Sequence, residues 1–159
     1  MIQMQRLTKR FIVKNIDNLN LSNSIIYERF YLPDQTVIQR KQDAYTKGTL
    51  VNSDIINQII ISQTEFEKLK QSAKNRIIRK SYLYLDDSRI SVKEYQDDLD
   101  GFIRAEVEFK TKSEMEDYHK ESWMGQEITK TPLAFDSLLS TLDKDELSKL
   151  LIKYDITID

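Results

Sequence analysis

Charged and apolar residues alternate in the run from Ile103 to Phe109. Because successive side chains of a strand point to opposite faces, Arg104, Glu106 and Glu108 share one face of this run. Two carboxylates about 6–7 Å apart on one strand face present the oxygen ligands that Mg²⁺ or Mn²⁺ prefers. We therefore take Glu106 and Glu108 as candidate metal ligands. An ordinary solvated strand face is the alternative.

Basic residues alternate with other types in further strand-like runs. They are Arg6 and Arg10 near the start, then Arg40, Lys80 and Lys93. If these faces converge inside a closed sheet, the buried like charges require an anion or a metal as compensation. A polyphosphate would supply it, whereas outward-facing strands would leave the same side chains in water.

Nine runs rich in Val, Ile, Tyr, Phe and Thr would position these residues on strands. They are 6–13, 25–32, 36–40, 45–50, 55–61, 77–85, 89–95, 103–109 and 127–129. Their alternation of apolar and polar residues is typical of an antiparallel sheet with one face in water.

Helices are fewer and have recognisable starts. The sequence from Ser62 to Glu65 has the form of a capping box and predicts a helix that ends near residue 73. A second such sequence begins at Thr111, Pro132 suits a first helical position, and Asp143 precedes the last apolar stripe. The fold class that these elements indicate is α+β, a large sheet with helices outside it.

The chain has 159 residues, with 24 Lys and Arg against 26 Asp and Glu, which suits a single domain over 1–159. The lack of Cys excludes disulfide scaffolds, thiolate zinc sites and a Cys nucleophile, and the single His119 excludes multi-His metal sites.

No apolar run reaches the roughly 20 residues of a membrane span, and the start lacks the charged-then-apolar pattern of a signal peptide. We expect a cytoplasmic protein without a membrane partner. The excess of Asp and Glu over Lys and Arg disfavours general nucleic-acid binding.

Two segments carry a resemblance to a known family. Leu99-Asp100-Gly101-Phe102 leads into Ala105-Glu106-Val107-Glu108, and Trp123-Met124-Gly125-Gln126-Glu127-Ile128-Thr129 follows. In order and spacing they resemble the C-terminal half of the CYTH, or triphosphate tunnel metalloenzyme, family. Looser similarity extends over most of the upstream chain.

This resemblance implies a closed antiparallel eight-stranded barrel, the triphosphate tunnel, with helices packed outside. In the family, inward Lys and Arg hold a tri- or polyphosphate and inward Glu hold Mg²⁺ or Mn²⁺. Its members include inorganic, thiamine and RNA triphosphatases and class IV adenylyl cyclases. By position, Glu106 and Glu108 would be metal ligands. The phosphate-binding residues would be Arg10, Arg40, Lys47 and Lys80, to which Arg6, Lys93 and Arg104 add inward positive charge.

The chain departs from the family where the acids are expected. The first strand of the family is Glu-x-Glu-x-Lys, whereas this chain has Arg6-Leu7-Thr8-Lys9-Arg10. A second acidic strand is replaced by Ile56-Asn57-Gln58, and Lys93 stands where an acid is usual. Because phosphoryl transfer in such a tunnel depends on a divalent ion, we expect Glu106 and Glu108 to bind Mg²⁺ or Mn²⁺ only weakly.

We therefore predict a tunnel protein with a degenerate active site that binds a triphosphate-containing small molecule or a nucleotide, with reduced or absent catalysis. One alternative is an active, metal-dependent triphosphatase or class IV-type adenylyl cyclase. The other is a protein-interaction module built on a tunnel that no longer binds phosphate.

Overall fold

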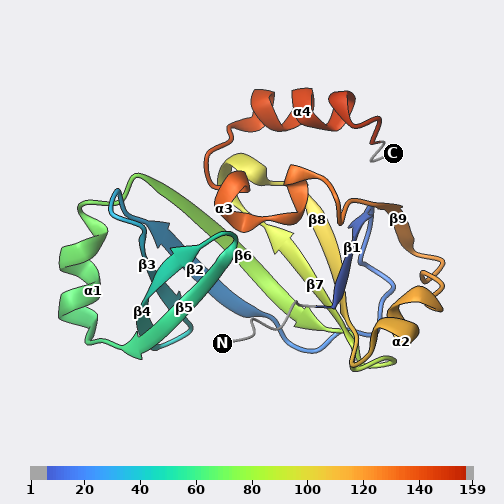
Figure 1. The fold of residues 1–159 in the computed structure, drawn as a ribbon, viewed down its shortest axis with the longest axis horizontal. Coiled ribbons are helices and arrows are strands. Elements are labelled where there is room, and N and C mark those ends of the chain that lie inside the picture. The colour runs from blue at the N-terminus through green and yellow to red at the C-terminus, as the bar shows by residue number, and fades with distance from the viewer. Residues whose placement is uncertain (1–6, 157–159) are drawn as a thin grey trace.

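The computed structural model describes residues 7–156. These residues form one antiparallel sheet, in the order β5-β4-β3-β2-β6-β7-β8-β1-β9, with short helices around it (Figure 1). The strands are β1 (Thr8–Val13), β2 (Ile25–Tyr31), β3 (Thr36–Lys41), β4 (Ala44–Val51), β5 (Asp54–Ile60), β6 (Asn75–Leu83), β7 (Ile90–Tyr95), β8 (Ile103–Glu108) and β9 (Met124–Glu127).

The helices connect strands or follow the sheet. They are α1 (Gln63–Lys70), η1 (Asp97–Leu99), α2 (Lys112–Glu116), η2 (Pro132–Ala134), α3 (Asp136–Leu139) and α4 (Lys144–Lys153). No helix within residues 7–156 is long and apolar enough to span a bilayer.

Side-chain caps form at the predicted helix starts Ser62 and Asp143, and of these two only Asp143 has both bonds of a capping box. The Ser62 hydroxyl accepts a hydrogen bond from the Glu65 amide at 3.1 Å, so α1 begins at Gln63. Asp143 accepts from the Glu146 amide at 2.8 Å while the Glu146 carboxylate accepts from the Asp143 amide, a complete capping box. Each cap satisfies backbone donors that the first helical turn leaves without partners.

The predicted closed eight-stranded barrel is wrong for the described part of the chain, which forms an open sheet of nine strands. Strand β1 pairs with β8 on one side and with the short β9 on the other, so neither edge of β1 is available to close the sheet. Strand β5 pairs with β4 and forms the opposite edge. The sheet still curves, and the β4–β5 hairpin faces β7, β8 and β1 across the molecule (Figure 1).

The outer face of the sheet is packed by α1 and α2. Around α1, Phe66 contacts the side chains of Phe30 and Ile38, and all three are buried. Around α2, a second cluster includes Val92 and Val107 of the neighbouring strands β7 and β8. These apolar residues fix which side of each strand faces outward, and therefore which residues face inward.

The inner face is closed at one end by a third apolar cluster. Ile12, Ile77 and Tyr95 of the sheet pack there against Leu133 and Leu139 from η2 and α3. Helix α4 lies over α3 and covers this end of the molecule (Figure 1). The remaining inner face is therefore bounded on one side by a dry core.

Candidate functional site

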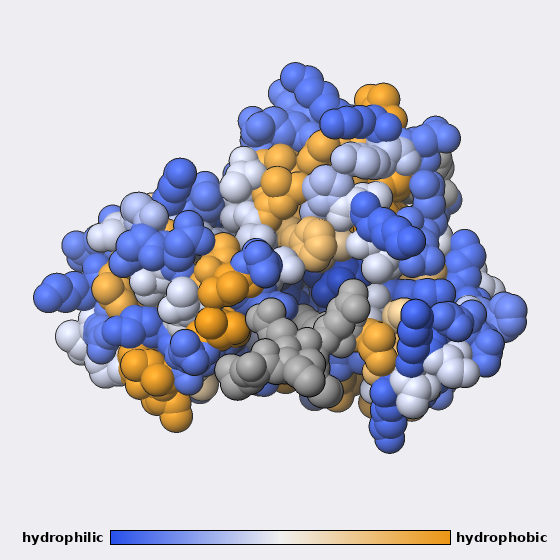
Figure 2. Space-filling view, viewed as in Figure 1, coloured by the Kyte–Doolittle hydropathy of each residue, from blue (hydrophilic) through white to orange (hydrophobic). Residues whose placement is uncertain are grey.

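A cavity of about 2030 Å³ lies against the inner face of the sheet. Figure 2 shows hydrophilic side chains deep in a hollow near the centre of that view. Most of the deep residues come from β1, β2, β6, β7 and β8, and the segment around η2 and α3 forms the wall nearest the apolar cluster. Five strands thus contribute to one polar surface.

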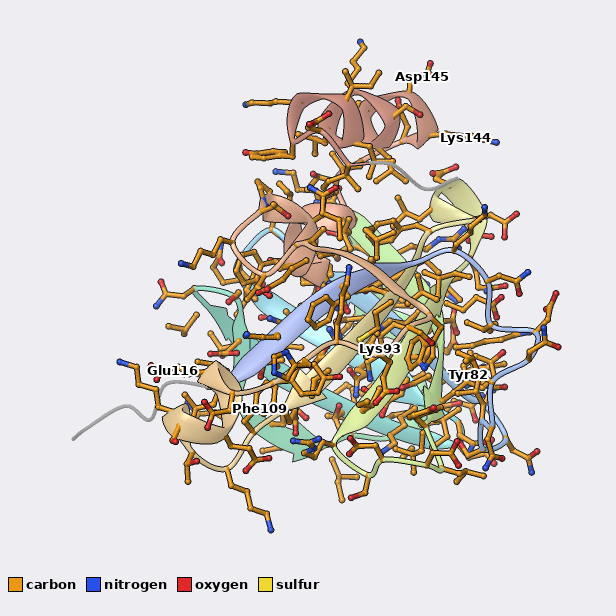
Figure 3. All side chains as sticks on the ribbon, turned by 90° about the vertical axis from the view of Figure 1, so that its right-hand side faces the viewer. Tyr82, Lys93, Phe109, Glu116, Lys144 and Asp145 are labelled. Carbon is orange, nitrogen blue, oxygen red and sulfur yellow. The ribbon has the colours of Figure 1, made fainter. Side chains whose placement is uncertain are left out.

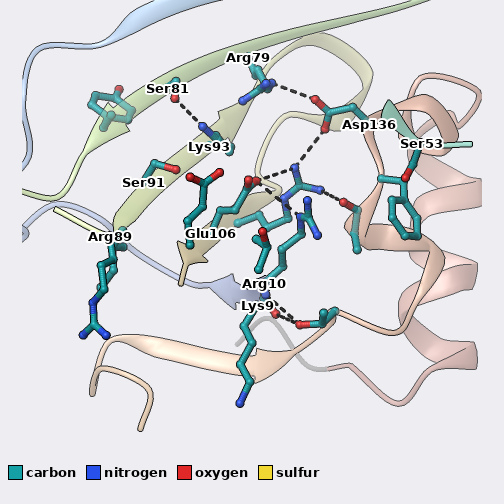
Figure 4. Close-up of a pocket in the computed structure, with 18 of the residues that line it drawn as sticks. Lys9, Arg10, Ser53, Arg79, Ser81, Arg89, Ser91, Lys93, Glu106 and Asp136 are labelled. Atoms are coloured by element: carbon teal, nitrogen blue, oxygen red, sulfur yellow. Dashed lines mark hydrogen bonds and ion pairs between the residues drawn. The ribbon is translucent and has the colours of Figure 1, made fainter. Parts of the chain in front are cut away.

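Strand β8 places Arg104 and Glu106 on this surface. Ala105 and Val107 are completely buried on the outer face, so the alternating residues must point inward. Arg104 is 3% and Glu106 7% exposed. Glu106 Oε2 lies 3.6 Å from Arg104 Nη2 and 3.6 Å from Arg10 Nε, because Arg10 is its cross-strand neighbour on β1 (Figure 4).

A second acid, Asp136, lies at the closed end of the cavity and binds three arginines. Its Oδ2 lies 3.1 Å from Arg29 Nη1 and 3.0 Å from Arg79 Nε, and its Oδ1 accepts a hydrogen bond from Arg104 Nη2 at 3.2 Å. The Tyr95 hydroxyl donates to the same Oδ1. Burial by itself would raise the pKa of Asp136, but the charges of Arg79, Arg104 and Arg29 outweigh it and hold that pKa well below its usual range.

Strand β7 contributes Lys93, whose Nζ donates a hydrogen bond to Ser81 Oγ at 2.9 Å (Figure 4). Figure 3 shows Lys93 inside the molecule, in contrast to Lys144 at the tip of α4. Burial lowers the pKa of Lys93 to about 8, and the nearby positive charges of Arg79 and Arg104 act in the same direction. Lys93 therefore lies in a region that already has an excess of positive charge.

Arg79 of β6 is 7% exposed, and its guanidinium lies 4.7 Å from the centre of the Tyr27 ring. Its Nη1 is buried and has no hydrogen-bond partner among residues 7–156. A buried guanidinium donor without an acceptor is costly. Arg79 thus lines the cavity and carries an unsatisfied buried donor.

The cavity brings together five of the site residues predicted from the sequence. They are Arg10, Lys93, Arg104, Glu106 and Glu108. Arg6 lies outside the described residues.

Arg40, Lys47 and Lys80 do not line the cavity, because the register puts them on the outer face. Arg40 Nη1 is 3.9 Å from Glu28, and Lys47 Nζ is 3.0 Å from Glu65 at the start of α1. Lys80 lies beside Glu94 in the β6–β7 ladder. On β6 the neighbour Arg79 points inward instead, one residue away from the predicted position.

Three further residues of the cavity were not predicted from the sequence: Arg29, Arg79 and Asp136. Arg79 directly precedes Lys80, so basic residue type alone could not decide which of the two faces inward. On β2 both Phe30 and Tyr31 are buried although they face opposite sides, so apolar character gives no signal for the direction of Arg29. Asp136 follows a loop and a turn of 3₁₀ helix, where no alternating pattern exists to indicate its direction.

The acids of the cavity do not fit a tight divalent-metal site. Glu106 is engaged with Arg10 and Arg104, and Thr8 lies opposite Glu108 in the ladder. Within residues 7–156 no group of three or more acidic, His or Cys side chains is arranged to hold a metal. A divalent ion at Glu106 and Glu108 would have to compete with two guanidinium groups.

Comparison with known proteins shows similarity of structure. No family model and no curated protein matches the sequence. A crystal structure of the inorganic triphosphatase NE1496 is 17% identical, with a TM-score of 0.73 over 89% of this chain and 98% of that one. A second crystal structure of NE1496, described as a hypothetical protein, is 18% identical, with a TM-score of 0.71 over 87% of this chain and 99% of that one. The chain therefore shares the fold of the NE1496 structures.

Proposed function

We propose that the cavity binds a triphosphate-containing anion, inorganic or part of a nucleotide, and that hydrolysis is reduced or absent. The observation that carries the proposal is the excess of buried positive charge. Five basic side chains, one from each of five strands, share the cavity with Glu106, Asp136 and the more exposed Glu108: Arg10, Arg29, Arg79, Lys93 and Arg104. Such an excess in a buried site is stabilised by a multivalent anion.

The donors that remain available suit phosphate oxygens. Arg29 is already engaged, since Nε and Nη2 donate to Gln39 and Nη1 donates to Asp136. Arg79 Nη1 and two of the three Lys93 ammonium hydrogens remain for a ligand. The NE1496 structure is that of an inorganic triphosphatase, which supports a triphosphate as the first ligand to examine.

The alternative is metal-dependent hydrolysis of a triphosphate, with Mg²⁺ or Mn²⁺ on Glu106 and Glu108. The activity of NE1496 favours it. The ion pairs of Glu106 and the absence of an acid at position 8 favour binding without turnover.

Calorimetric titration with inorganic triphosphate, in EDTA and again in Mn²⁺, separates these readings when phosphate release is assayed on the same samples. We expect binding in EDTA without product. The Lys93→Met variant should bind at least about tenfold more weakly, because a charge-assisted contact with the anion is lost. The matched Lys80→Met variant changes the outer face of the adjacent strand and should bind within about twofold of wild type.

Two results would overturn the proposal. Equal affinity in the Lys93→Met and Lys80→Met variants would mean that the cavity is not the binding site. Binding that requires Mn²⁺ and ends in released phosphate would establish the enzymatic alternative.

A further inference from the structure

Asp136 occupies an unusual position between the cavity and the dry core. It is the first residue of α3, separated from the end of η2 by Phe135, and its side chain is only 8% exposed. Behind it, Leu133 and Leu139 are completely buried in the apolar cluster. The carboxylate therefore lies at the edge of the packed apolar core and is directed at the basic side chains of the sheet (Figure 4).

The contacts of Asp136 restrict two arginines that also face the cavity. Arg104 is held by Asp136 and by the carbonyls of Leu133 and Ala134, which accept from Nη1 at 3.2 and 2.7 Å. Arg79 forms an ion pair with Asp136, with 3.0 Å between Nε and Oδ2, while its Nε and Nη1 have no hydrogen-bond partner in the described chain. In Arg104 both terminal nitrogens are engaged and only Nε has no hydrogen-bond partner in the described chain, and both arginines line the cavity.

We propose that Asp136 is a positioning residue for the anion site: it fixes Arg79 and Arg104 so that their remaining N–H groups meet the bound triphosphate. This inference rests on the proposed function. A guanidinium that is already oriented loses less side-chain entropy when a phosphate binds, and its planar donors meet the oxygens in a defined geometry. The negative charge itself opposes an anion, so positioning and repulsion act in opposite directions on affinity.

Positioning strengthens triphosphate binding, whereas charge repulsion weakens it. The direction in which affinity changes when Asp136 is substituted therefore distinguishes the two effects. The Asp136→Asn variant makes the cavity one unit more positive and weakens the hold on both arginines. If Asp136 positions them, inorganic triphosphate in EDTA binds about tenfold more weakly to the folded variant despite the added positive charge. Tighter binding would show that Asp136 acts only as a repelling charge, and unchanged binding would show a purely structural role. Either result overturns the proposal.

A double-mutant cycle makes the assignment specific. In an Arg79→Met background, Asp136→Asn should weaken binding by less than in wild type, because one of the two positioned arginines is gone. Full additivity of the two changes in binding free energy would contradict positioning of Arg79.

If Asp136→Asn does not fold, Tyr95→Phe removes one donor to the Asp136 carboxylate and keeps its charge. We expect about threefold weaker binding for Tyr95→Phe and none of this loss for Tyr84→Phe, which changes a buried tyrosine on the outer face.

NMR spectra recorded without ligand test the restraint of the arginines by Asp136 independently of triphosphate binding. In ¹⁵N NMR spectra, the side-chain Nε signals of Arg79 and Arg104, assigned with Arg79→Lys and Arg104→Lys, should be sharp and well separated in wild type. They should broaden or converge in Asp136→Asn. If they do so but wild type binds no triphosphate, the proposed function fails while the restraint of the arginines stands. Identical signals in both proteins would overturn the restraint itself.

Discussion

Two groups of basic side chains lie on opposite faces of the same sheet. On the inner face, Arg79 and Arg104 are nearly inaccessible to solvent and share the single carboxylate of Asp136. On the outer face, the Arg40 side chain is 45% exposed and the Lys47 side chain 35% exposed, and each lies near an acid of its own.

The difference shows that basic residues on a strand do not make an anion site by themselves. On the outer face water solvates each charge, so an ion pair there contributes little and a ligand gains little by replacing it. On the inner face the charges are desolvated and outnumber the neighbouring acids, so each depends on its neighbours. The two faces should therefore respond very differently to loss of a cation.

The largest expected effect is on folding stability. Arg104→Met removes a buried ion pair with Asp136 and leaves the carbonyls of Leu133 and Ala134 without their donor. We expect a loss of about 3–5 kcal/mol in the free energy of unfolding, measured in urea. The matched outer-face variant Lys47→Met should lose less than about 1 kcal/mol. Similar losses in both variants would remove the distinction between the faces.

How far the sequence predicts these faces depends on the strand. In β8, charged residues alternate with the small or apolar Ala105 and Val107, so burial of the apolar side decides the direction of Glu106. In β6, the sequence Ile77-Ile78-Arg79-Lys80 has pairs of like residues, and either register satisfies the pattern. A shift of one residue exchanges the two faces, which is why Lys80 was predicted inward where Arg79 lies.

Two other features are absent from any local pattern. Asp136 reaches the cavity through packing of η2 and α3 on the sheet, which is a tertiary effect. The open sheet follows from β9 pairing with β1, and a pattern of alternation gives strands but not their neighbours. The helix caps, most strands and five cavity residues could be predicted from the sequence, whereas register and closure could not, and the last strand, predicted at 127–129, lies at Met124–Glu127.

A second, smaller effect is in the pH dependence of stability. The folded-state pKa of Lys93 is about 8, below the roughly 10.4 of a solvated lysine. Between these values the unfolded chain binds more protons, so the free energy of unfolding rises with pH. From pH 8 to 9.5 we expect wild type to gain roughly 1–2 kcal/mol relative to Lys93→Met. Comparison with Lys93→Met cancels the pH dependence that other titrating groups contribute to the free energy of unfolding. Parallel stability–pH profiles of the two proteins would mean that Lys93 is not desolvated.

The smallest expected effect is stabilisation by a divalent metal. It tests whether the inner face lacks the acids that metal binding needs. Thr8 is buried and lies opposite Glu108 in the β1–β8 ladder, so Thr8→Glu adds a carboxylate beside Glu106 and Glu108. We expect Mn²⁺ to raise the melting temperature of this variant by about 2–4 °C over its value in EDTA, and that of wild type by less than about 1 °C. Thr49→Glu, on the exposed outer face of β4, should respond as wild type does. A wild-type response as large as that of Thr8→Glu would mean that Glu106 and Glu108 already bind the ion in spite of Arg10 and Arg104, and the inner face would then hold a metal and a phosphate together.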